Sequence, residues 1–292
     1  MSQVLDNLFL KMHKNIFIIS LKKSFVDIWR NKSLFLLLFI LQVIFFASLF
    51  LLSNNYIPKM MESAKAIQDY LSNLNFDENA ITSGIMERRN PLGDDPLSIS
   101  RNFNDILVNF RLYIISLFVL ILLFISISWS ITHKLIHKLN LRQFTRYFFK
   151  ILTVSFFYLI LIFSFFFSLF NISLADITIE SAKLFSKYIP FLIFSIVLAY
   201  FMFISLSLLH KAELRNIVQK TLTIGIKKIH YVFLLYLIII LLVMIPTALT
   251  ILWLTYFETG FFILMFSSLV MIFSFVFGRI LMVNFIEKLA DL

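Results

Sequence analysis

Six apolar runs, each about twenty residues long, constrain this chain more than any other feature. A helix of about twenty residues spans the hydrocarbon core of a bilayer. Hydrophobic residues make up 60% of the 292 positions and charged residues only 14%, whereas about a quarter of a soluble domain is charged. The runs do not alternate apolar and polar residues as the strands of a membrane barrel do. We therefore predict an all-α polytopic membrane protein, with six helices paired as three hairpins that span about 34–53, 112–132, 151–172, 190–209, 231–255 and 260–282.

The charged residues between the runs predict the transmembrane topology of the chain. One set of segments carries 18 Lys and Arg against 5 Asp and Glu, and the other carries 8 against 11. Loops rich in Lys and Arg stay in the cytoplasm, so the sequence predicts a cell-membrane protein with both termini cytoplasmic. The basic set comprises 1–33, 133–150, 210–229 and 279–292, and the acidic set comprises 54–111, 173–189 and 256–259.

This layout divides the chain into an amphipathic cytoplasmic region, 1–33, and a six-helix transmembrane domain, 34–292, with an outer loop at 54–111. The chain has no cysteine, which excludes thiolate metal sites and cysteine nucleophiles. Ionisable residues fall in loops or at the edges of spans, with Arg111 and Arg279 nearest the hydrocarbon. Buried ionisable residues usually mark proton and ion paths, so the pattern disfavours proton-coupled transport.

An internal repeat relates two of the cytoplasmic junctions. A shift of 77 residues places Ser128, Ser130, His133 and Lys134 on Ser205, Ser207, His210 and Lys211. Each copy ends a span in S-x-S-x-x-H-K and continues into a basic connector.

The basic connectors have amphipathic helical patterns. Leu141, Phe144, Phe148 and Ile151 share one helical face, and Leu21, Phe25 and Ile28 form a similar stripe. Such helices lie in the head-group plane with their cations toward phosphates, although they also serve simply to lead the chain into the membrane. Contact with anionic head groups, or with a partner protein, is therefore predicted for Lys22, Lys23, Trp29, Arg30, Lys32, Lys134, Lys138, Arg142, Arg146, Lys150, Lys211, Arg215, Lys227 and Lys228.

The stretch SISWSITHKLIHKLN allows two interpretations of its histidines. His133 and His137 lie at i and i+4, and His210 ends another span, so three imidazoles could meet at a metal ion if the two copies are adjacent. No carboxylate follows on that face to orient them, and Leu214 replaces His137 in the second copy. The sequence therefore favours an interfacial anchor over a metal site, and no cofactor is predicted.

The segment SFVDIWRNKSLFLLLF, Ser24 to Phe39, carries an aromatic-Arg-Asn turn immediately before the first span. With the paired spans and amphipathic connectors, it resembles uncharacterised six-span membrane protein families of archaea and bacteria. It is also similar to the membrane domain of some glycerophosphodiester phosphodiesterases. The resemblance implies a membrane-embedded accessory domain and transfers no catalytic residue.

These patterns predict a non-enzymatic scaffold or transport-related component that binds lipids or partner subunits. A partner protein would contact the cytoplasmic face or the outer loop. A nucleic-acid partner is not expected, because no soluble basic module with base-reading groups is visible. The alternatives are a permease subunit of an ATP-driven transporter and, third, a lipid-modifying membrane enzyme.

Overall fold

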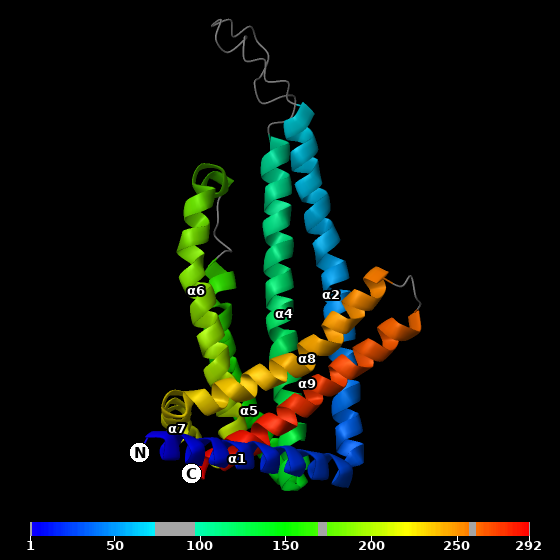
Figure 1. The fold of residues 1–292 in the computed structure, drawn as a ribbon. Helices are drawn as coiled ribbons and strands as arrows, with labels where there is room; N and C mark the ends of the chain where they lie inside the picture. The colour runs from blue at the N-terminus through cyan, green and yellow to red at the C-terminus, as the bar shows by residue number, and fades with distance from the viewer. Residues whose placement is uncertain (1, 74–96, 169–173, 257–260, 292) are drawn as a thin grey trace, which may run out of the picture. The chain divides into compact units, whose positions relative to one another are not determined.

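The computed structural model describes residues 2–73, 97–168, 174–256 and 261–291 (Figure 1). Within these ranges the chain is all-α and forms no strand, which confirms the predicted fold class. The helices are α1 (Ser2–Arg30), α2 (Lys32–Asn73), α4 (Leu97–His137), α5 (Leu141–Ser168), α6 (Leu174–Leu208), α7 (Leu214–Lys227), α8 (Ile229–Tyr256) and α9 (Phe261–Ala290).

Six of the helices are long and apolar enough to cross a membrane, so the protein is a multi-pass membrane protein. Each coincides with a predicted span, but the ends differ. Mean hydropathy selects the apolar centre of a helix, whereas backbone hydrogen bonding continues through polar residues at both ends. The apolar segments are Lys32–Tyr70, Leu97–His137, Leu141–Ser164, Ile189–Leu208, Ile229–Trp253 and Met265–Ala290.

The connectors differ from one another. Residues 141–150, predicted as an amphipathic connector, are the first turns of α5. Only three residues separate α5 from α4, and the first of them, Lys138, has a positive φ of 51°. Before α8, by contrast, the connector is a separate helix, α7. Nearer the N-terminus, Asn31 lies between α1 and α2 and donates a side-chain hydrogen bond to the carbonyl of Leu135, 2.9 Å away.

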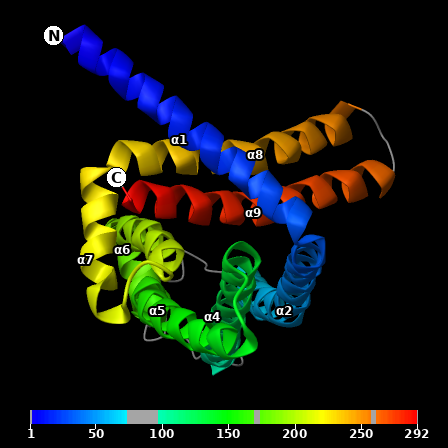
Figure 2. The same cartoon turned by 90° about the horizontal axis from the view of Figure 1, so that it is seen from below.

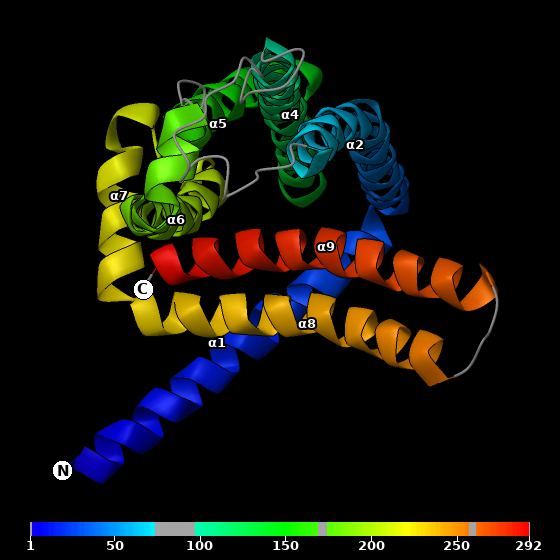
Figure 3. The ribbon, with the colours of Figure 1, turned by 90° about the horizontal axis from the view of Figure 1, so that it is seen from above.

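By their contacts the helices form two compact units. The larger unit comprises Met1–Phe46, Ile121–Ile162 and Ile193–Leu292. Here α8 and α9 lie side by side (Figure 2), and α1 crosses α9 (Figure 3). In the apolar 18-residue stretch that marks each helix as a candidate span, 67% of α9 is buried, against 11% of α8, so α9 is a central helix of this unit.

The smaller unit comprises Ala47–Leu120 and Phe163–Leu192. In it α2 and α4 are joined by the rings of Tyr56 and Tyr113, with centroids 6.1 Å apart, and by a 3.4 Å contact between the Ser53 and Tyr113 hydroxyls. Phe118 on α4 meets Phe163 on α5 edge to face. The ends of the predicted outer loop are therefore helical extensions of α2 and α4, and residues 74–96 lie outside the described ranges.

The prediction that ionisable residues stay at span edges is wrong for α9. This helix runs to Ala290 rather than to about 282, so Arg279 lies within its membrane-crossing segment. Arg279 donates to the Gln42 side chain at 3.2 Å and lies over the ring of Phe124, 5.5 Å from its centroid. Gln42 itself is buried, and polar groups at membrane depth need such partners.

Candidate functional site

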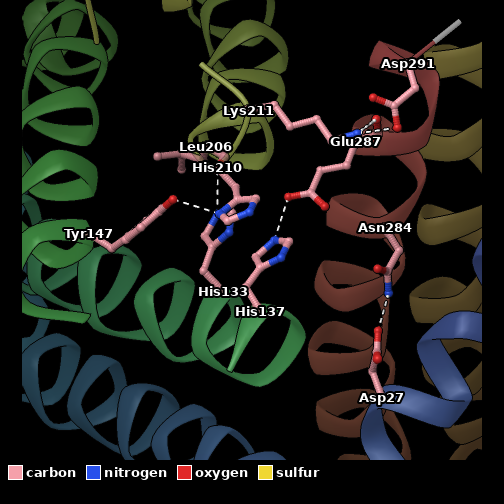
Figure 4. A network of polar contacts seen from close by, with 10 residues as sticks. All are labelled: Asp27, His133, His137, Tyr147, Leu206, His210, Lys211, Asn284, Glu287 and Asp291. Carbon is pink, nitrogen blue, oxygen red and sulfur yellow. Dashed lines mark hydrogen bonds and ion pairs between the residues drawn. The ribbon is translucent and has the colours of Figure 1, made fainter. Parts of the chain in front are cut away.

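A cluster of polar side chains lies where the end of α4 meets α5, α9 and the segment after α6 (Figure 4). We call His133, His137, His210 and Glu287 the histidine cluster. The hydroxyls that precede it on α4 are satisfied within their own helix, since Ser130 and Thr132 donate to the carbonyls of Ser126 and Ser128. This local bonding lets a polar sequence be buried.

His133 is fully buried, so its imidazole is not the interfacial side chain that the anchor interpretation predicts. Its Nε2 lies 2.8 Å from the carbonyl oxygen of Leu206 on α6. A carbonyl only accepts hydrogen bonds, so Nε2 carries the proton. The other nitrogen, Nδ1, is buried and has no hydrogen-bond partner. Burying an unsatisfied nitrogen is costly, which makes it the feature of the cluster that most needs a physical reason.

Glu287 on α9 supplies the carboxylate that the sequence did not locate. Its Oε1 accepts a hydrogen bond from His137 Nε2 at 2.8 Å, and its side chain is only 5% exposed. The sequence argument considered only carboxylates that follow the histidines on their own helical face, whereas Glu287 comes from a different helix. Glu287 lies 150 residues from His137 in sequence, and only the packing of α9 brings the two together.

His210, which follows α6, is the third imidazole of the histidine cluster. Its ring is stacked on His137 with centroids 3.7 Å apart. The Tyr147 hydroxyl lies 2.8 Å from His210 Nδ1. Desolvation, together with the nearby His137, lowers the pKa of His210, so this imidazole is neutral over more of the physiological range than an ordinary histidine.

A second polar contact joins α9 to α1. Asn284 donates to the Ser24 hydroxyl and to the Asp27 carboxylate, both at 3.1 Å. Burial raises the pKa of Asp27, opposed by this hydrogen bond and by the charge of Lys23. A cavity of about 430 Å³ connects the two polar contacts, since Asn284, Glu287, His137 and His210 all line it.

A basic pocket of about 680 Å³ lies between α7 and the end of α9. We call it the lysine pocket, after Lys211, Lys220 and Lys228, which line it. Lys211 donates to the carbonyl of Glu287 at 2.8 Å and pairs with Asp291, and Lys228 donates to the carbonyl of Leu289 at 2.7 Å. Cations at these positions satisfy the last carbonyls of α9 and favour its helix dipole.

The other predicted contact residues are spread over several helices. Trp29 is 75% exposed and has the ammonium of Lys32 3.8 Å from its ring centroid. The ammonium of Lys134 lies over Phe144, and that of Lys150 over Tyr147. The remaining predicted cations have exposed side chains: Lys22, Lys23, Arg30, Lys138, Arg142, Arg146, Arg215 and Lys227.

The predicted apolar stripe of α1 is not its buried face. Ile16, Ser20 and Ser24 are buried, four residues apart, whereas Phe25 of the predicted stripe is exposed. Sequence reasoning also missed Tyr147, Asn284, Glu287 and Lys220 as site residues. Asn284 and Glu287 are polar residues that follow directly on an apolar run, and their i, i+3 spacing places them on one helix face.

Comparison of the chain with protein-family models, with curated proteins and with solved structures found no match. The chemistry of the site therefore rests on its own residues: an imidazole–carboxylate cluster suited to a cation, and a lysine pocket suited to an anion.

Proposed function

We propose that this protein is a non-enzymatic multi-pass membrane protein that holds anionic lipid head groups in the lysine pocket, as a scaffold or transport-related component. We propose the cell membrane as its location, with both termini cytoplasmic, because Lys and Arg outnumber Asp and Glu by 18 to 5 in the segments that include the two termini. The observation that carries the proposal is the convergence of three lysines on one cavity at the ends of two membrane-crossing segments.

The chemistry of the pocket suits a phosphate-bearing head group. Lys211 and Lys228 end at the carbonyls of α9, and Lys220 donates to the carbonyl of Lys211 at 2.9 Å. Each ammonium has three donors, and Lys228 and Lys220 each use one of them in these contacts, so further donors are available to phosphate oxygens. Basic pockets between helices on the cytoplasmic side are a recurrent form of head-group site.

The outer face of α7 suits the acyl chains of the same lipid. Four apolar side chains, spaced every fourth residue, are 40–61% exposed along this helix. The opposite face is buried through Ile217, Thr221 and Ile224. A helix with one apolar exposed stripe and lysines beside it lies at the boundary between head groups and acyl chains. The exposed stripe comprises Leu214, Val218, Leu222 and Ile226.

The test is native mass spectrometry of anionic phospholipid retained from bilayer discs that contain phosphatidylglycerol and phosphatidylcholine. Lys220→Gln combined with Lys228→Gln removes two pocket charges, each worth about 1 kcal/mol near an anionic surface. We expect phosphatidylglycerol to bind about 30-fold more weakly, by the usual conversion of about 1.4 kcal/mol per decade.

The matched control is Lys59→Gln combined with Lys65→Gln, which removes two exposed charges from α2 and should leave retention unchanged. Equal retention in the pocket variant and in the wild type would contradict lipid binding at this site. Loss of a co-purifying protein, with lipid retention intact, would instead identify the pocket as a contact for a partner.

A further inference from the structure

We propose that His133, His137 and Glu287 form a binding site for a divalent transition-metal ion of the zinc class. One candidate ligand atom from each residue lies within 4.8 Å of those of the other two. The two histidines are one helical turn apart on α4, and Glu287 faces them from α9 (Figure 4). Ligands about 2.1 Å from a tetrahedral Zn²⁺ lie about 3.4 Å from one another, so binding requires the side chains to adjust: the widest separation shortens and the 2.8 Å contact between His137 and Glu287 lengthens.

The unpartnered nitrogen of His133 is the strongest single observation. With Nε2 donating to Leu206, the lone pair of the neutral ring is on Nδ1, which is buried without a partner. Metal-bound histidines commonly donate their other nitrogen to a backbone carbonyl, which fixes the tautomer and the ring orientation. A metal ion at Nδ1 therefore accounts both for the bond to Leu206 and for the unsatisfied nitrogen.

The pair formed by His137 and Glu287 supplies the other two ligands. Nε2 and Oε1 are 2.8 Å apart, and the two side chains are 14% and 5% exposed. The hydrogen bond shows that the His137 imidazole and the Glu287 carboxylate already face one another. A metal ion that replaces the shared hydrogen keeps the carboxylate charge compensated in this buried position.

The ligand types select the class of ion. Two imidazoles and one carboxylate suit Zn²⁺, and also Fe²⁺, Co²⁺ and Ni²⁺, whereas Ca²⁺ and Mg²⁺ prefer all-oxygen sites. Three protein ligands leave a fourth position open. His210 stacks on His137, and the cavity of about 430 Å³ that His137, His210 and Glu287 line gives the ion a route of entry.

The bound ion would link two membrane-crossing helices. The histidines belong to α4 and the glutamate to α9, so coordination crosslinks them at one end of the larger unit. The lysine pocket shares none of the three ligands, although Lys211 and Asp291 line both cavities.

The test uses the full-length protein in detergent, stripped with a chelator and then titrated with Zn²⁺ or Co²⁺. We expect one ion per chain, a Co²⁺ absorption spectrum with the intensity of a four-coordinate site, and a higher melting temperature with Zn²⁺. Glu287→Gln keeps the size of the side chain and a hydrogen-bond acceptor for His137. We expect it to weaken Zn²⁺ binding by roughly 100-fold. Loss of a residue that only hydrogen-bonds a metal ligand already costs up to about 100-fold in metal affinity.

His133→Ala should have a similar effect on Zn²⁺ affinity, whereas His230→Ala, which removes an exposed histidine at the start of α8, should have none. The spectrum of the wild type needs no variant, so the proposal stays testable if a substitution prevents folding. Wild-type protein that binds no Zn²⁺ or Co²⁺ above the His133→Ala level would overturn the proposal, as would equal binding in all variants.

Discussion

At the scale of single residues, two positions combine an unusual environment with a clear consequence for stability. Lys138 directly follows α4 and has a φ of 51°, a left-handed conformation that costs a residue with a Cβ about 1–2 kcal/mol. Asp27 has its carboxylate partly buried against α9. Neither feature follows from residue type alone, because both depend on where the neighbouring helices begin and end.

Lys138→Gly is expected to stabilise the protein, because glycine adopts the left-handed conformation without steric cost and is the preferred residue after a helix end. The gain should be about 1 kcal/mol, read as a higher melting temperature in detergent. Lys138→Ala is the control, since alanine loses the same charge but keeps the Cβ. Equal melting temperatures for the two variants would show that the backbone at this position is not strained.

Asp27→Asn tests the buried carboxylate. Because burial raises the pKa of Asp27 above 3.8 in the folded protein, the folded state holds its proton more tightly than the unfolded state does. Stability from this group is therefore present below the unfolded pKa and is lost as the pH rises through the folded pKa.

Asparagine stays neutral and still offers an acceptor to Asn284. We expect Asp27→Asn to raise the melting temperature at pH 7 and to have a smaller effect at pH 4. A variant that is less stable than the wild type at pH 7 would mean that the charged carboxylate is itself stabilising.

At the scale of elements, the close approach of α7 to α6 stands out. A Cβ added at Gly225 would lie 2.6 Å from Cε1 of Phe201. At the same contact the Tyr200 hydroxyl on α6 donates to the Gly225 carbonyl on α7 at 2.9 Å. The Tyr236 hydroxyl on α8 in turn donates to the carbonyl of Tyr200 at 3.1 Å. Gly225 thus allows three helices to meet around two tyrosines.

Gly225→Ala is expected to destabilise the protein by about 1 kcal/mol. Overpacking a close contact costs about 1–3 kcal/mol, and the better helix propensity of alanine returns up to about 1 kcal/mol. Melting temperatures in detergent measure the difference, with Thr223→Ala on the exposed face of α7 as the control. Adding Phe201→Leu should reverse the loss, and a Gly225→Ala variant as stable as the wild type would contradict the close contact.

The sequence predicted the centres of the spans but not the ends of the helices. Apolar runs of about twenty residues identify membrane-crossing segments by themselves. The residues around Arg142 and Arg146, however, fit an interfacial helix and the first turns of α5 equally well, since both are amphipathic. Glu287 could not be assigned to the histidines, because no local pattern connects residues 150 positions apart.

At the scale of the whole molecule, hydropathy did not distinguish the central helix from the peripheral ones. The apolar 18-residue stretches of α8 and α9 have mean hydropathies of 2.9 and 2.2, yet 11% of the first and 67% of the second is buried. In a membrane both lipid and protein interiors are apolar. The lower value of α9 reflects residues such as Arg279 and Asn284, which need protein partners.

The transmembrane topology can be tested with single introduced cysteines, because the natural sequence contains no cysteine. Gln143 and Ser72 are both exposed and lie in segments of opposite charge balance. With the termini cytoplasmic, an impermeant thiol reagent added to intact cells should label Ser72→Cys and spare Gln143→Cys. After permeabilisation both should react. Labelling of Gln143→Cys from outside would reverse the assigned orientation and place the lysine pocket on the outer face.

The pairing of α1 with α9 has a consequence for biosynthesis. The Asn284 amide that bonds Asp27 is made 257 residues later in the chain, and translation at about 5–20 residues per second takes roughly 10–50 s to cover that distance. During this interval Ser24 and Asp27 on α1 have been made, but their partner on α9 has not. The nascent chain therefore carries a complete α1 whose polar groups lack their partner, and an insertion factor or a membrane-bound chaperone would have time to recognise it.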